Sequence, residues 1–178
     1  MPLTSEEQFL LELINRARLD PVAEAARYGI DLNAGLAAGA LTGGSRQVLA
    51  PNSALETAAL GHSLWMLATD IFSHTGAGGS QPWDRATAAG YDWSRSGENI
   101  AWSGTSAASF SLQTAILAHH EGLFRSAGHR VNLLNDSYAE VGLARETGGS
   151  RRHEVQQRVT GGALPLGRIA VGGRDSQD

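Results

Sequence analysis

Helices dominate the early part of this chain and strands come late, and this order limits the fold more than any other feature. Apolar residues at helical spacing predict a first helix that starts after Thr4, a long helix at 53–71 and another at 107–124. The clearest extended segments are residues 97–102 and 138–145. Because helices and strands do not alternate regularly, the order favours an α+β layer arrangement over an alternating parallel sheet.

Composition narrows the class of protein further. The chain has 178 residues, no cysteine and a formal net charge of −4. This length suits one domain that buries its core without disulfides or a structural metal. No block of basic residues is present, so we expect no nucleic-acid partner, because binding to phosphates needs a clustered positive field.

The N-terminal segment carries Glu6 and Glu7 where an export signal would be basic. Its apolar residues are also interrupted every few positions. We therefore expect neither a cleavable signal peptide nor a transmembrane segment. A cytoplasmic protein, export by another route and removal of the original start all stay open as explanations.

Two histidines and a glutamate are the strongest candidates for a functional site. We interpret His74 and His129 as loop residues, each beside glycine-rich sequence, and Glu98 lies between them in a Gly-Glu-Asn context. Two imidazoles and a carboxylate suit a divalent metal such as zinc, and they equally suit a hydrogen-bonded acid–base group. No short metal motif joins the histidines, so from spacing alone the simpler interpretation is that each caps a turn or bonds a carbonyl.

The other histidines favour structural roles. His119 and His120 are adjacent on a predicted helix, so their rings point about 100° apart and a core or capping role is expected for each. His62 on the helix at 53–71 is interpreted in the same way. The four tryptophans are interpreted as core residues, and no Gly-x-Ser-x-Gly elbow supports Ser/His/Asp catalysis.

Four segments, taken together, carry a family resemblance. They are Asn52–Leu55 with Ala59–His62, Phe72–Gly76, Gly90–Tyr91 with Gly97–Ala101, and Leu123–Leu134. Their order and spacing are similar to those of the bacterial, SCP-like branch of the CAP superfamily. That superfamily includes the cysteine-rich secretory proteins, the allergen V5/Tpx-1-related antigen 5 proteins and the pathogenesis-related proteins.

The resemblance implies an α-β-α sandwich with a cleft built from two histidines and two glutamates. His74, Glu98 and His129 match three of these positions, and we expect them to converge in one cleft. The fourth position falls near Ser126, and Glu121, one helical turn earlier, is the candidate replacement. His74 and His129 are then the expected ligands of Zn²⁺ or another divalent cation, with Glu98 as the third protein ligand.

The last part of the chain departs from the family. The resemblance covers residues 5–145, which we interpret as the CAP domain, and residues 146–178 form a divergent or truncated tail. Only Val159-Thr160 hints at the strands that relatives add there. We therefore expect the C-terminal strands to be incomplete and residues 147–178 to be less ordered than the rest.

For function, the resemblance implies a secreted or cell-surface domain that binds rather than catalyses. The expected partner is a lipid, a sterol or another hydrophobic small molecule, and the sequence does not indicate an oligomeric state. The alternatives are a metal-dependent, peptidase-like hydrolase with Glu98 as general base and a cell-surface interaction module. Because a fold does not fix a function, these alternatives stay open.

Overall fold

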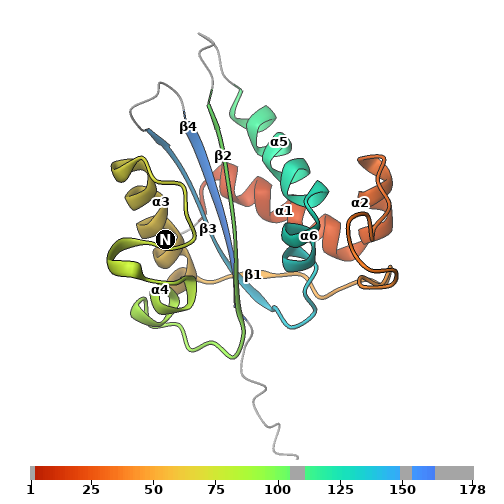
Figure 1. Ribbon diagram of the computed structural model, residues 1–178, viewed down its shortest axis with the longest axis horizontal. Coiled ribbons are helices and arrows are strands. Elements are labelled where there is room, and N and C mark those ends of the chain that lie inside the picture. Colours follow the sequence, from red (N-terminus) through yellow and green to blue (C-terminus); the bar gives the residue numbers. More distant parts are fainter. Residues whose placement is uncertain (1–2, 105–110, 149–153, 163–178) are drawn as a thin grey trace, which may run out of the picture.

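The computed structural model describes residues 3–104, 111–148 and 154–162 of the chain (Figure 1). The helices are α1 (Ser5–Leu19), α2 (Pro21–Arg27), α3 (Ser53–Thr69), α4 (Pro82–Ala88), α5 (Leu112–Arg125) and α6 (Ala127–Leu133), with a short 3₁₀ turn at Ala77–Gly79. The strands are β1 (Ala50–Pro51), β2 (Ser96–Gly104), β3 (Glu140–Gly148) and β4 (Glu154–Gly162).

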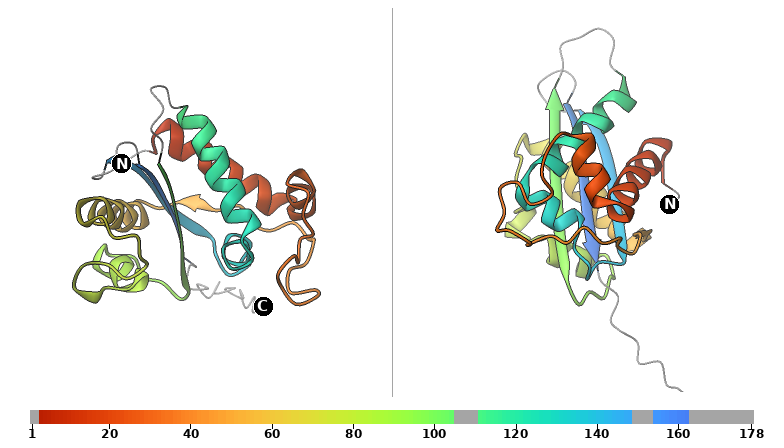
Figure 2. Two further views of the ribbon diagram at one scale, coloured as in Figure 1. Left: turned by 45° about the horizontal axis from the view of Figure 1, so that its top comes forward. Right: turned by 90° about the vertical axis from the view of Figure 1, so that its right-hand side faces the viewer.

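The four strands form one sheet in the order β1-β3-β4-β2. The short strand β1 runs parallel to β3, while β4 pairs antiparallel with both β3 and β2. Helices α3 and α4 cover one face of the sheet, and α1, α5 and α6 lie on the other (Figures 1 and 2). The predicted α+β fold, an α-β-α sandwich, is confirmed.

Side chains cap the long helices at the positions where the sequence breaks. At the start of α1, the Glu7 backbone N–H donates to Thr4 Oγ1 (3.2 Å), and the Thr4 N–H donates to the Glu7 carboxylate (2.9 Å). Asn52 caps α3 by accepting from the N–H groups of Ala54 and Leu55. Ser111 caps α5, so this helix begins later than the predicted residue 107.

The main core lies between the sheet and the layer that contains α1 and α5. Its buried side chains include Leu10, Ile14, Ala17, Ile116, Leu123, Phe124, Val141 and Leu143. Two arginines are also fully buried, and both donate to backbone carbonyls. Arg18 bonds the carbonyls of residues 47, 133, 135 and 138, and Arg130 bonds those of residues 32, 34, 124 and 125. These bonds satisfy carbonyl groups in loops and in the last turns of α5 and α6.

The sheet extends past the predicted end of the domain at residue 145. Strand β3 continues to Gly148, and β4 lies between β3 and β2 and pairs with both along its length. The C-terminal strand that was expected to be degenerate therefore occupies the middle of the sheet. Residues 149–153 and 163–178 of the predicted tail lie outside the described residues, and the lower order of residues 147–178 stays a prediction. No described helix is long and apolar enough to cross a membrane.

Candidate functional site

Glu98 of β2 is the buried anion of the site. Its Oε1 accepts a hydrogen bond from His74 Nδ1 (2.9 Å), and its Oε2 accepts one from Arg85 Nη2 (2.9 Å). The Glu98 side chain is 1% exposed, whereas His74 is half exposed. Because the carboxylate can only accept, His74 carries its proton on Nδ1, which makes Nε2 the ring nitrogen with the lone pair.

The loop that follows α3 carries His74, and residues of α3 and α4 hold this loop in place from two directions. His62, buried on α3, donates from Nε2 to the carbonyl of Ser73 (2.8 Å), and its ring stacks on Trp65. Arg85 of α4 donates to the carbonyl of His74 itself (3.0 Å). The structural role expected for His62 is therefore confirmed, and it consists of positioning the residue next to His74.

His129 is the third residue of helix α6, not a loop residue as predicted. Ser126 adopts an extended conformation between α5 and α6, which ends one helix and starts the next. Ser126 Oγ also bonds His129 Nδ1 (2.8 Å). On β2, Asn99 donates to the His129 carbonyl (3.2 Å) and accepts from Asn132 (2.9 Å), which ties α6 to the strand.

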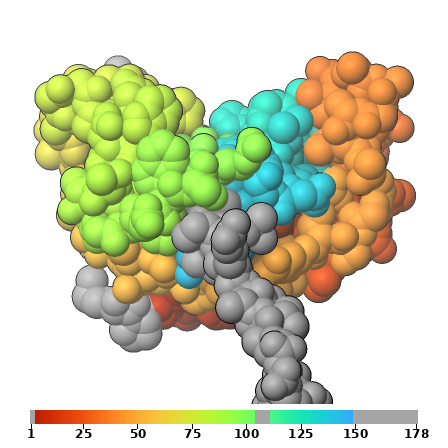
Figure 3. All heavy atoms as spheres, turned by 90° about the horizontal axis from the view of Figure 1, so that it is seen from below, coloured from red at the N-terminus to blue at the C-terminus, as the bar shows by residue number. Residues whose placement is uncertain are grey.

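Two of the three predicted cleft residues, His74 and Glu98, are in direct contact, and the convergence of His129 with them in one cleft stays a prediction. His74 and His129 approach from opposite helical layers and are anchored at the neighbouring residues Glu98 and Asn99. Burial lowers the pKa of His129 below its ordinary value, and the charge of nearby His74 lowers it further. Figure 3 shows the surface hollowed between the yellow-green residues that include α4 and the cyan residues that include α5 and α6.

An apolar cavity adjoins His129. It has a volume of about 410 Å³ and lies between Phe72, residues 100–103 of β2, and α5. At its rim, the half-exposed rings of Phe72 and Trp102 meet edge to face with centroids 6.5 Å apart.

The exposure of the tryptophans differs from the prediction. Trp83, Trp93 and Trp102 are all substantially exposed, so the expectation that the tryptophans are core residues is wrong for these three.

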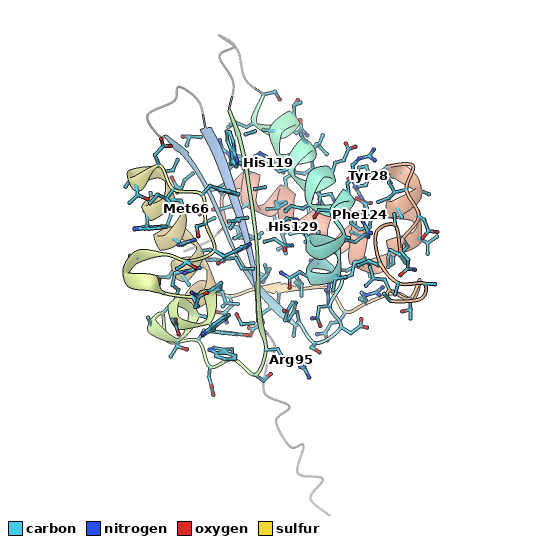
Figure 4. All side chains as sticks on the ribbon, viewed as in Figure 1. Tyr28, Met66, Arg95, His119, Phe124 and His129 are labelled. Carbon is cyan, nitrogen blue, oxygen red and sulfur yellow. The ribbon has the colours of Figure 1, made fainter. Side chains whose placement is uncertain are left out.

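His119 of α5 also lines this cavity (Figure 4). Its ring is buried and bonds Ser103 Oγ through Nε2 (2.9 Å). Burial, together with the charge of Arg145, lowers the pKa of His119 to about 4. The ring is therefore neutral at physiological pH.

This burial predicts an acid-sensitive fold. Between about pH 6.5 and pH 4 the unfolded chain protonates His119 and the folded chain does not, so stability should fall by up to about 3 kcal/mol as pH drops through this window. His119→Gln retains a hydrogen-bonding side chain but does not titrate. Urea unfolding at several pH values should show a shallower pH slope for this variant, and an unchanged slope would contradict the prediction.

Glu121 does not complete the site. Its carboxylate accepts from Arg125 Nε (2.7 Å) on α5, it is 41% exposed, and it lies on a different face of the helix from the cavity-lining His119 and Ser126. Within the described residues, no group of three or more His, Asp or Glu side chains is placed to hold a metal ion. Glu98 is therefore not placed as the expected third ligand, because Arg85 and His74 Nδ1 engage both of its oxygens.

Three functional positions were missed at the sequence level. Arg85, Ser126 and Asn99 orient Glu98, His129 and the α6 backbone respectively. Ser126 could have been found, because it precedes His129 by three residues at a helix start. Arg85 carries no local signal, since only the packing of α4 against β2 brings it to Glu98.

The family follows from comparison with known proteins. A family model described as the cysteine-rich secretory protein family, CAP, matches residues 11–160. The chain belongs to the CAP family. A comparison with curated proteins gives no match.

Solved structures support the same CAP fold. The chain is similar to an extracellular protein containing an SCP domain from Bacillus anthracis, with 24% identity and a TM-score of 0.53. The match covers 89% of this chain and 44% of that one, so the chain spans less than half of that relative. An outer surface protein from Borrelia burgdorferi gives 15% identity, coverage of 92% and 97%, and a TM-score of 0.59. NaASP2, solved with Zn²⁺, gives 18% identity, coverage of 88% and 80%, and a TM-score of 0.52.

Proposed function

We propose that this CAP domain is a non-catalytic binding module that takes a hydrophobic ligand beside its histidine cleft, outside the cell or on its surface. The observation that carries the proposal is the apolar cavity next to His129. Its volume of about 410 Å³ falls in the range of small-molecule sites, and its lining is mainly apolar with a few polar groups. A lipid, a sterol or another hydrophobic small molecule fits this chemistry.

The surface location is supported by two of the similar proteins, which are an extracellular protein and an outer surface protein. A cytoplasmic location is the alternative. Fractionation of the native host, with detection of the chain in medium, envelope and cytosol, separates the two.

The hydrolase alternative is not favoured by the geometry of Glu98. A general base needs a carboxylate oxygen directed at the proton it removes. Here Oε1 accepts from His74 and Oε2 accepts from Arg85. With both oxygens engaged in this way, the Glu98 carboxylate orients His74 and is not directed at a substrate.

Titration with a fluorescent fatty acid and a fluorescent sterol tests the binding function. Saturable binding without turnover is expected, and Trp102→Ala should weaken it by about tenfold, because an aromatic wall of the cavity is lost. Turnover of a model ester or peptide that disappears in Glu98→Gln would overturn the proposal in favour of the hydrolase.

A weak zinc site formed by His74 and His129 is the second part of the proposal. Each ring bonds a protein group through Nδ1, as ligand histidines in metal sites do, which orients Nε2 as the coordinating nitrogen. Zinc bound there would act as a Lewis acid, and the remaining coordination positions would belong to water or ligand. Ligation by only two side chains predicts weak affinity.

Zinc binding should depend on pH and on His129. Imidazole binds metal only when neutral, so zinc affinity should fall between about pH 7.5 and pH 5.5. Because the pKa of His129 is lowered, His129 should lose its ability to bind zinc only towards the acid end of this range. In calorimetric titration, His129→Ala should abolish measurable binding. His153→Ala is the control and should bind as the wild type does. Equal affinity at both pH values would identify the cluster as a hydrogen-bonded structural group.

A further inference from the structure

The outer edge of β2 at residues 100–103 has no strand partner in the described part of the chain. β2 is the terminal strand of the sheet, and its ladder joins it to β4 alone. In an antiparallel pair, alternate residues direct their N–H and C=O groups to the partner and the others direct theirs away from it. Among the described residues, no backbone hydrogen bond joins residues 100–103 to a segment other than β4. Such a row of groups is a template for a further strand.

The apolar cavity lies along this edge. It is lined by the consecutive residues Ile100, Ala101, Trp102 and Ser103. Consecutive side chains of a strand point to opposite faces of the sheet, so a cavity that touches all four must run past the edge of the strand and not over one face. The far wall is α5, whose Gly122 and Leu123 face the strand across the cavity.

The edge is also recessed. The segment with Phe72 and His74 lies on one side of β2, and α5 and α6 lie on the other, so the strand forms the floor of the hollow seen in Figure 3. Walls on both sides of the strand favour a narrow occupant over a second sheet or a folded domain. A single extended chain needs only about 4.8 Å between strands in the hydrogen-bonding direction.

The charge of the residues that line the groove indicates which side chains an extended peptide bound there would carry. No Asp, Glu, Lys or Arg side chain is among the described residues that line the cavity. Its polar lining consists of hydroxyl groups and the imidazoles of His119 and His129. The groove therefore complements an uncharged segment whose side chains alternate between the aromatic rim and the Leu123 side.

We propose that the hydrophobic ligand of this cleft is an extended peptide segment with uncharged, apolar side chains, which adds to β2 as a fifth strand. This inference rests on the proposed binding function and names its ligand. Backbone hydrogen bonds to β2 supply affinity, and the cavity between β2 and α5 selects the side chains.

Gly122 offers a way to block the groove without disturbing the fold. A Cβ built on Gly122 meets nothing within 4 Å, and the residue is an exposed position of α5 that lines the cavity. Gly122→Leu therefore places a side chain in the groove. Gly61 of α3 is the matched control, because it is also an exposed helical glycine with nothing within 4 Å, and it lies outside this cavity.

The test starts with a display library of random linear peptides of about ten residues, roughly the length of a strand. Selected peptides should bind the wild type and Gly61→Leu with equal affinity and Gly122→Leu at least about tenfold more weakly. N-methylation of the peptide should weaken binding by about tenfold or more at every second position and have little effect in between. Amide hydrogen exchange at residues 100–103 should slow in the complex.

The inference is overturned if no peptide is enriched, if Gly122→Leu binds selected peptides as the wild type does, or if N-methylation acts without alternation. The fatty acid and sterol titrations separate this failure from failure of the proposed function. If Gly122→Leu blocks binding of the fatty acid or sterol probe and no peptide is enriched, the proposed binding function is supported and the peptide inference is wrong. If neither probe nor peptide binds the wild type, both proposals are wrong.

Discussion

Replacing Glu24 with alanine should lower the free energy of unfolding by about 3–5 kcal/mol, because it removes a buried anion and leaves the Arg16 guanidinium and the buried His120 ring without their hydrogen-bond acceptor. Glu24 of α2 is 1% exposed. Its carboxylate accepts from Arg16 Nε and Nη2 (2.8 and 2.6 Å), the Tyr28 hydroxyl (3.0 Å) and His120 Nε2 (2.9 Å). One residue thus links α1, α2 and α5.

The charge of Glu24 is stabilised by these partners and not by solvent. Burial by itself raises the pKa of a carboxyl group, but the hydrogen bonds from His120 and Arg16 outweigh it and lower the pKa of Glu24 to about 2. The folded-state value lies below the ordinary 4.5, so the stabilisation is complete above about pH 4.5 and is lost as pH falls towards 2. Glu24→Ala should therefore lose most stability at neutral pH and less in strong acid.

Denaturant unfolding at neutral pH measures the effect. Glu12→Ala is the control, because Glu12 is an exposed residue of α1 whose carboxylate accepts from the neighbouring Gln8, and it should change stability by less than about 0.5 kcal/mol. A loss below about 1 kcal/mol for Glu24→Ala would show that the buried cluster contributes little to the fold.

This cluster also shows where sequence reasoning stops. Helical spacing correctly placed His120 on an inward face of α5. It could not name Glu24 as the partner, because 96 residues separate them and only the packing of α2 against α5 brings them together. Tyr28 and Phe124, whose rings lie 5.8 Å apart, belong to the same contact (Figure 4).

The helices and the matched motifs could be predicted because their signals are local. The capping pair of Thr4 and Glu7 and the long apolar period of α3 are both complete within a few turns of sequence. Helix α6 has only seven residues, which is too short for a period to show, so His129 was assigned to a loop. The polar composition of residues 154–162 likewise hid a strand that is paired on both sides.

The cleft residues were identified by motif, but their roles depend on contacts between separate elements. The Gly-Glu-Asn segment marks Glu98, yet its use as an orienting anion follows from Arg85 on α4. A carboxylate near two histidines suggested three metal ligands. The packing of α4 turns that carboxylate into a hydrogen-bond acceptor for Arg85 and His74.

Among the glycines that the structure describes, Gly142 should be the one at which alanine does most damage. A Cβ at Gly142 of β3 would lie 2.0 Å from the carbonyl carbon of Leu55 and 2.3 Å from the Glu56 nitrogen. Both atoms belong to the backbone of α3, so no side-chain rotation relieves the overlap, and α3 must move away from the sheet. We expect a loss of more than about 4 kcal/mol, or failure to fold.

The displacement should reach the functional site as well as the fold. α3 carries His62, which holds the carbonyl of Ser73 and so positions His74. In any folded fraction of Gly142→Ala, zinc affinity should therefore fall together with stability. Gly61→Ala is the matched control, since a Cβ there meets nothing within 4 Å and alanine favours a helix by about 0.5–1 kcal/mol. Denaturant unfolding of both variants decides the point: a loss under about 1 kcal/mol for Gly142→Ala would mean that α3 and β3 do not pack at backbone contact.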